Sequence, residues 1–258
     1  MLYCTEMGSQ QGDPILFLHA GSFSGTMWQQ IAGGLPEMRC LLPDLPGHGY
    51  SRNIELQTLA HAADTVAALL FEKPRHRPVH LVGLSFGGYV GLILMARHPQ
   101  LISRAMLSGI HLGAIPNPRM MQLFAGAISP LIRLKWFRKR MAASLGVTTP
   151  EIYDRADGAA NLSPRTLRRL LHLVSVFDVQ DLLAEINVPT LMIAGKKEHP
   201  TILQSLSDFQ QLMPQCTART VPELGHAWCN QDPRLFTETV RAWVNQSPLP
   251  SQLTAVAR

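Results

Sequence analysis

Ser85 is the residue whose surroundings most clearly predict chemistry. It is the centre of Gly83-Leu84-Ser85-Phe86-Gly87, a G-x-S-x-G pattern between a short apolar run and the apolar residues 89–96, which have the length of a helix. A serine in the sharp turn between a strand and a helix takes a strained backbone conformation that exposes its hydroxyl. The spacing therefore predicts a nucleophilic serine. A glycine-rich turn without chemistry is the alternative.

A serine hydroxyl becomes a strong nucleophile when a base removes its proton, and the base works best when a carboxylate fixes its orientation. Among the 10 histidines, His226 is the predicted base. It follows the apolar strand expected at 218–221 and precedes the last expected helix, which suits the chain order serine, acid, histidine. A histidine in a surface loop, without a catalytic role, is the alternative.

Glu198 is the predicted acid. It follows the apolar strand expected at 190–194 and precedes His226, in the required order. A solvated charge in a Lys-Lys-Glu loop is the rival interpretation of this residue. Asp178 and Asp181 precede that strand and are expected to cap or solvate a junction, and Glu223 is near His226 in sequence without a fixed orientation.

The tetrahedral intermediate of acyl transfer needs two preorganised donors, and losing one costs about 3 kcal/mol in known cases. The N–H of Phe86, next to the serine, is one expected donor. The turn His19-Ala20-Gly21-Ser22 is expected to supply the other, from the Gly21 N–H. His19 itself is expected to brace this turn.

The composition is that of an ordinary globular protein. The chain has 258 residues, of which 46% are hydrophobic and 16% are charged, enough for one sizeable core. We see no signal peptide and no apolar run long enough for a membrane span. The four cysteines lack C-x-x-C spacing, which favours reduced thiols in a cytoplasmic protein: Cys4, Cys40, Cys216 and Cys229.

Strands that alternate with helices predict a parallel sheet, with functional residues at the carboxyl ends of the strands. Residues 112–180 break this alternation. In that range a capping residue precedes a proline four times, at 117–118, 129–130, 149–150 and 163–164, which is typical of helix starts. We therefore predict a core of residues 1–111 and 181–246, a helical cap over 112–180, and a loose tail over 247–258.

The net charge of +5 is concentrated in the predicted cap, where ten basic residues accompany four acidic residues. No nucleic-acid motif accompanies this charge, so we expect no nucleic-acid partner. A weaker hypothesis is that acidic or carboxylate-bearing substrates are favoured. Apolar residues of the cap are expected to pack together and to roof a pocket. The residues expected to line that pocket are Phe23, Leu123, Phe124 and Trp228.

Taken together, these features resemble the α/β-hydrolase family over almost the whole chain. The resemblance rests on His19 with Trp28 after it, and on the D-x-x-G-x-G-x-S pattern of residues 44–51. It also rests on the G-x-S-x-G-G pattern around Ser85, on the acid Glu198 and on the pair Gly225-His226. It implies an α/β fold with a mostly parallel eight-stranded sheet, helices on both faces, a four-helix cap after strand six, and a Ser-acid-His triad. It implies no cofactor, and we expect no metal. Ala20 and Glu198 depart from the commoner glycine and aspartate.

The expected function is that of a serine hydrolase that cleaves carboxylic esters of small, largely apolar substrates through an acyl-enzyme. Ser85 argues against relatives that use aspartate as nucleophile. A ligand receptor derived from a hydrolase stays open, although such receptors typically lack a glycine equivalent to Gly88. A C–C bond hydrolase, a lactonase and a perhydrolase on the same scaffold are further alternatives.

Overall fold

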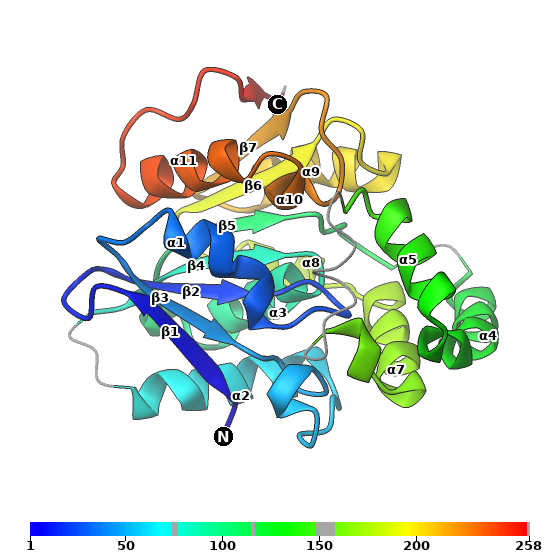
Figure 1. Ribbon diagram of the computed structural model, residues 1–258. Coiled ribbons are helices and arrows are strands. Elements are labelled where there is room, and N and C mark those ends of the chain that lie inside the picture. Colours follow the sequence, from blue (N-terminus) through cyan, green and yellow to red (C-terminus); the bar gives the residue numbers. More distant parts are fainter. Residues whose placement is uncertain (74–76, 115–116, 148–157, 257–258) are drawn as a thin grey trace.

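An eight-stranded sheet runs through the centre of the molecule (Figure 1). The computed structural model describes residues 1–73, 77–114, 117–147 and 158–256, apart from the side chain of Pro118. The strand order is β1-β3-β2-β4-β5-β6-β7-β8, and only the edge strands β1 and β8 pair antiparallel to their neighbours. The strands are β1 Cys4–Gly8, β2 Pro14–Leu18, β3 Arg39–Pro43, β4 Val79–Leu84, β5 Ile102–Ser108, β6 Thr190–Gly195, β7 Cys216–Val221 and β8 Thr254–Ala255.

Helices cover both faces of this sheet because its central strands are apolar on both sides. In β2, Ile15 and Phe17 pack in one core cluster, whereas Leu16 and Leu18 pack in the other. The helices of the core are α1 Gln29–Gly33, α2 Leu59–Glu72, α3 Phe86–Arg97, α9 Pro200–Leu212, α10 Trp228–Gln231 and α11 Pro233–Val244. Residues of α1 and α11 belong to the cluster of Phe17, and residues of α2, α3 and α9 to the cluster of Leu16. The predicted mostly parallel eight-stranded sheet with helices on both faces is confirmed.

Every element of regular secondary structure in the described part of the cap segment, residues 112–180, is a helix. Its helices are α4 Pro118–Ile128, η4 Ser129–Arg133, α5 Lys135–Ser144, η5 Ala159–Asn161, α7 Pro164–Ser175 and the start of α8 Gln180–Leu183. Three of the four expected helix starts are found, and the start expected at 149–150 lies outside the described residues. Figure 1 shows α4, α5 and α7 grouped at one end of the sheet.

The number of strands before the cap differs from our expectation. Five strands precede residues 112–180, and the predicted position after strand six is therefore one strand too late. The sheet reaches eight strands because Thr254 and Ala255 form β8 against β7. This pairing also differs from the loose tail that we expected for residues 247–258, since Thr254 and Ala255 are held at the sheet edge.

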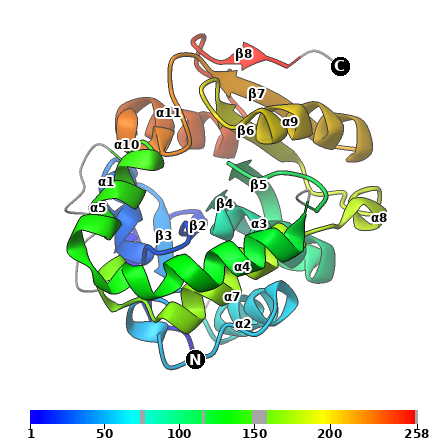
Figure 2. The same ribbon diagram turned by 90° about the vertical axis from the view of Figure 1, so that its right-hand side faces the viewer.

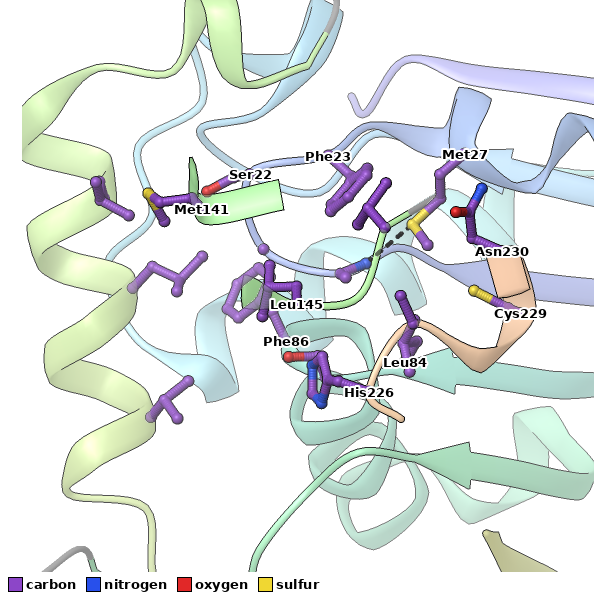
Figure 3. Close-up of a pocket in the computed structure, with 18 of the residues that line it drawn as sticks. Ser22, Phe23, Met27, Leu84, Phe86, Met141, Leu145, His226, Cys229 and Asn230 are labelled. Carbon is purple, nitrogen blue, oxygen red and sulfur yellow. Dashed lines mark hydrogen bonds between the residues drawn. The ribbon is translucent and has the colours of Figure 1, made fainter. Parts of the chain in front are cut away.

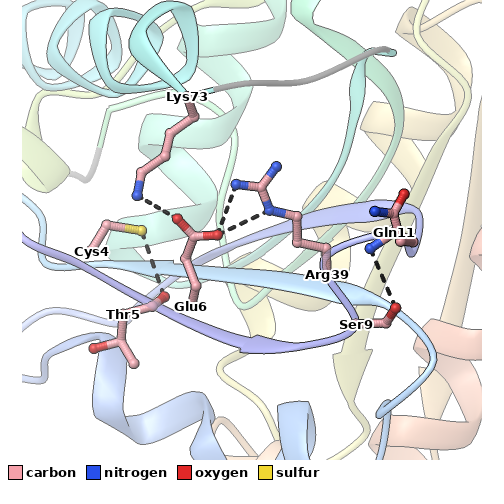
Figure 4. Close-up of polar contacts among 7 residues, drawn as sticks. All are labelled: Cys4, Thr5, Glu6, Ser9, Gln11, Arg39 and Lys73. Atoms are coloured by element: carbon pink, nitrogen blue, oxygen red, sulfur yellow. Dashed lines mark hydrogen bonds and ion pairs between the residues drawn. The ribbon is translucent and has the colours of Figure 1, made fainter.

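A carboxylate on the first strand ties the sheet edge to a helix end (Figure 4). Glu6 accepts hydrogen bonds from Arg39 at 2.8 Å and 2.9 Å, and it also pairs with Lys73, the residue that caps α2. The Glu6 side chain is 20% exposed. Burial acts to raise the pKa of Glu6, but the bonds from Lys73 and Arg39 outweigh it, and the pKa is lowered.

Replacement of Glu6 by Gln is expected to lower the free energy of unfolding by about 1–2 kcal/mol at pH 7, because two cations lose a charged acceptor. The lowered pKa means that this stabilisation is full above the unfolded carboxyl pKa and disappears as the pH falls through the folded value. Urea unfolding at pH 7 and pH 3 measures both effects. Glu238→Gln, in an exposed pair with Arg234, is the control and should cost less than about 0.5 kcal/mol. Equal losses for the two variants would contradict the prediction.

Candidate active site

Ser85 occupies a strained turn between β4 and α3. Its backbone has φ 52° and ψ −119°, a conformation that costs a non-glycine residue energy and persists only when its surroundings enforce it. The Ser85 N–H donates to the Ser108 carbonyl at 2.8 Å. A Cβ atom on Gly87 would lie 2.1 Å from the Leu18 carbonyl oxygen, so only glycine fits there. The predicted strand–turn–helix setting of Ser85 is therefore present.

The other two predicted side chains are joined by a short hydrogen bond. Nδ1 of His226 lies 2.6 Å from Oε2 of Glu198. The carboxylate is 7% exposed and the imidazole 17%, so the pair is partly shielded from water. Because the Nδ1–H of His226 donates a hydrogen bond to Glu198, Nε2 of His226 is the ring nitrogen left to accept a proton. The imidazole packs against Gly109, where an added Cβ would lie 2.8 Å from Cε1 of His226.

The rival carboxylate Glu223 does not compete for this position. Its side chain is 83% exposed and pairs with Lys197 at 3.0 Å. The Glu198 side chain is fixed further, since its Oε1 accepts from the His199 N–H at 3.1 Å. The short loop after β6 therefore aims Glu198 at His226 and leaves Glu223 in solvent. Asp178 accepts from the N–H of Gln180, the first residue of α8, at 3.3 Å, but the N-cap residue of this helix is Val179.

The turn after β2 is braced by His19. Nε2 of His19 accepts from the Leu45 N–H at 2.9 Å, which leaves the proton on Nδ1, 2.9 Å from the Ala20 carbonyl. Burial lowers the pKa of His19 to about 4, so the ring is neutral. The predicted bracing role is confirmed. Asp44 fixes the next loop, since its carboxylate accepts from the N–H groups of Gly25 and Tyr50 at 2.7 Å and 2.8 Å.

Gly21 and Phe86 both line the same cavity as Ser85. Within the described chain, neither N–H donates to another residue, whereas the neighbouring Ala20 N–H is taken by Sδ of Met27 at 3.3 Å. Phe86 is the first residue of α3, where a helix leaves its N–H groups unpaired. In the described chain, Gly21 and Phe86 therefore each retain a backbone donor without a protein acceptor.

The cavity beside Ser85 has a volume of about 190 Å³ and a mainly apolar wall (Figure 3). Ser85 and His226 both line it. Figure 3 shows Phe86 and His226 together on one wall and Met141 from the cap on another. The cap contributes the following apolar side chains: Met141, Leu145, Val147, Leu167, Leu170, Leu171 and Val174.

Phe23 lines this cavity as predicted, but the other three predicted pocket residues do not. Leu123 and Phe124 are 78% and 56% exposed on α4, a helix that contacts α7. Trp228 is fully buried in the core, where its indole N–H donates to the Ser108 hydroxyl at 2.9 Å. The predictions for Leu123 and Phe124 are wrong because α7, rather than α4, lines the cavity beside the serine. The prediction for Trp228 is wrong because its ring is buried in the core.

The sequence contained a signal for the residues that we missed. Leu167, Leu170, Leu171 and Val174 follow the i, i+3, i+4, i+7 spacing of an apolar helix face. No arginine or lysine of the described chain lines the cavity. The described residues contain no group of three or more His, Cys, Asp or Glu that could hold a metal ion.

The comparisons with known proteins show the family of the chain. The model of the alpha/beta hydrolase family matches residues 15–239. An AB hydrolase superfamily protein of Gibberella zeae is 25% identical over 93% of this chain and 82% of its own. A pimeloyl-[acyl-carrier protein] methyl ester esterase of Vibrio vulnificus is 22% identical over 88% of this chain and 92% of its own.

Among solved structures, the esterase EaEST from Exiguobacterium antarcticum matches with a TM-score of 0.82 at 18% identity, over 95% of both chains. At that identity the likeness concerns the fold alone.

The four cysteines are free thiols, and in the described part of the chain no helix has the length and apolar character to cross a bilayer. With the family model matching most of its length, the chain belongs to the alpha/beta hydrolase family.

Proposed function

We propose that this protein is a serine hydrolase that cleaves carboxylic esters of small, mainly apolar substrates through an acyl-enzyme. The observation that carries the proposal is the shared cavity of Ser85 and His226, with the imidazole held by Glu198 on the far side. A nucleophile and a base that meet at one cavity, with the base oriented by a buried carboxylate, suit acyl transfer.

The chemistry follows from these positions. His226 Nε2 takes the Ser85 proton while Oγ bonds to the ester carbonyl carbon. The carbonyl oxygen becomes an oxyanion and accepts hydrogen bonds from the Gly21 and Phe86 N–H groups. The C–O bond to the alcohol then breaks, and His226 returns the proton to the leaving oxygen. A water molecule, deprotonated by the same imidazole, attacks the acyl-enzyme and releases the acid.

The apolar wall of the cavity favours substrates with an apolar acyl group. Its cap side consists of leucine, valine and methionine side chains, and no cationic side chain of the described chain faces it. A charged acyl group would lose hydration there without gaining a partner. The hypothesis that carboxylate-bearing substrates are favoured therefore receives no support at this cavity, and we propose uncharged esters instead.

Leu145 offers a test of where the acyl chain binds. It lines the cavity beside the His226 loop, since its carbonyl accepts from the Ala227 N–H at 3.1 Å. Replacement by Phe fills acyl space, and we expect the ratio of activity on p-nitrophenyl acetate to activity on the hexanoate to rise about tenfold. Steady-state rates on a series of acyl chain lengths, with a lactone and an amide added, measure this ratio.

Leu134→Phe is the matched control, because Leu134 is 42% exposed at the start of α5 and does not line the cavity. Its chain-length profile should equal that of the unmodified protein. If the chain-length profile of Leu145→Phe also stays unchanged, the acyl group does not bind in this cavity. Turnover of the lactone or the amide, without turnover of any ester, would contradict the proposed reaction class.

A further inference from the structure

A second concave surface lies on the other side of α7. It is a groove of about 1380 Å³ formed by α4, α7 and residues 47–58 of the core, and it shares no lining residue with the catalytic cavity. Figure 2 shows α4 and α7 side by side over this end of the molecule. One face of α7 therefore lines the catalytic cavity and the other lines the groove.

The groove is strongly basic. It is lined by five arginines and one carboxylate, which gives a net charge of +4: Arg52, Arg119, Arg165, Arg168, Arg169 and Glu55. Glu55 is already paired with Arg165 at 2.6 Å. Nε of Arg169 donates to the Gln57 carbonyl at 2.7 Å. Within the described residues, Arg119 and Arg168 pair with no acidic side chain. Two guanidinium groups therefore face the groove without an anion.

This arrangement suits a small ligand with several negative charges. A guanidinium presents a planar fork of donors that matches two oxygens of a phosphate group. A concave surface with charge of one sign also concentrates its counter-ions more than a flat surface does. The arginines come from three separate segments that converge on one hollow, which favours a compact anion over the broad face of an acidic protein.

We propose that the groove between α4, α7 and residues 47–58 binds a small polyanion that carries a pyrophosphate or two phosphate groups. Arg119 and Arg168 are its main partners, because the other arginines have contacts within the protein. The polyanion contacts the face of α7 opposite to Leu167, Leu170 and Leu171, outside the catalytic cavity. It is therefore a second ligand, distinct from the ester.

Isothermal titration of the full chain with pyrophosphate at low ionic strength tests this site. We expect one equivalent to bind, with a Kd at least about tenfold higher in the Arg119→Gln/Arg168→Gln variant, since charged hydrogen bonds are lost. Orthophosphate should bind more weakly than pyrophosphate. The control variant Arg133→Gln/Arg140→Gln removes the same charge from exposed cap positions outside the groove and should change Kd less than about twofold.

Three results would overturn the proposal. The first is no binding of pyrophosphate by the folded, unmodified protein, and the second is an equal loss in both double variants, which would show a general charge effect. The third is binding of a glutamate-rich peptide through Arg119 and Arg168 when pyrophosphate does not bind, which would assign the groove to an acidic protein surface. Thermal melts verify that the variants fold. The Ser85→Ala protein should bind pyrophosphate normally, so the result is independent of ester hydrolysis.

Discussion

Replacement of Ser85 by Ala is expected to lower kcat/KM for p-nitrophenyl acetate by at least about 10⁴-fold. In the proposed mechanism the Ser85 hydroxyl oxygen forms the acyl-enzyme, so this variant lacks the nucleophile. The remaining activity would come from the oxyanion donors and from binding in the cavity. The variant should fold normally, because Ala in the strained turn keeps the same backbone and the Ser85 N–H still donates to Ser108.

The control for this experiment is Ser207→Ala on α9. The Ser207 hydroxyl accepts a hydrogen bond from Gln211, and Ser207 does not line the cavity. It should retain full activity. Thermal melts of both variants should agree with that of the unmodified protein within a few degrees. Turnover by Ser85→Ala close to that of the unmodified protein would end the assignment of Ser85 as nucleophile.

Replacement of Glu198 by Gln is expected to lower kcat by about 10³–10⁴-fold with a smaller effect on KM. An amide still fits the site, but it can donate to Nδ1 of His226, which would place the ring proton on Nε2 and remove the base. The 2.6 Å contact with His226 and the 7% exposure of the carboxylate support Glu198 as the proposed acid. Initial rates over a range of ester concentrations separate kcat from KM.

Glu223→Gln is the matched control, because it removes a carboxylate three residues from His226 that lies in solvent. We expect its kcat to stay within about twofold of the unmodified value. A larger loss in Glu223→Gln than in Glu198→Gln would reverse the assignment of the acid. Loss in neither variant would mean that His226 works without a carboxylate partner.

The positions of Ser85, His226 and Glu198 could be predicted because each has a local signature at the end of a strand. Buried parallel strands carry apolar runs that are visible in the sequence, and their carboxyl ends meet at one edge of the sheet. The glycines around Ser85 mark the tight approach of α3 to Leu18. The brace at His19 followed from the same reasoning, since a buried histidine next to a turn needs partners for both ring nitrogens.

The covering of the cavity could not be predicted in the same way. Periodicity shows that a helix has an apolar face, but not which layer that face packs against. Both α4 and α7 carry apolar stripes, and we assigned the roof to α4 through Leu123 and Phe124. In the structure α7 lies between α4 and the serine, so its leucines line the cavity. The order of packing in the cap depends on contacts that are distant in sequence.

The position of the positive charge of the cap also could not be predicted from the sequence. The count of arginines and lysines over residues 112–180 gave the sign of the charge, and we connected it with the substrate. The structure places Arg165, Arg168 and Arg169 on the groove side of α7 and leaves the catalytic cavity without cations among its described lining residues. A helix of 12 residues can carry apolar side chains on one face and cationic side chains on the other, and its packing decides which ligand contacts each face.

The most direct test of the account is the covalent state of Ser85 after reaction with a serine-directed fluorophosphonate. Peptide mass mapping should find one equivalent of phosphonyl group on Ser85, with ester hydrolysis lost in proportion. The Ser85→Ala protein should take up none, and the His226→Ala protein should react far more slowly. Stoichiometric labelling of another residue, or full hydrolytic activity after Ser85 is labelled, would contradict the account.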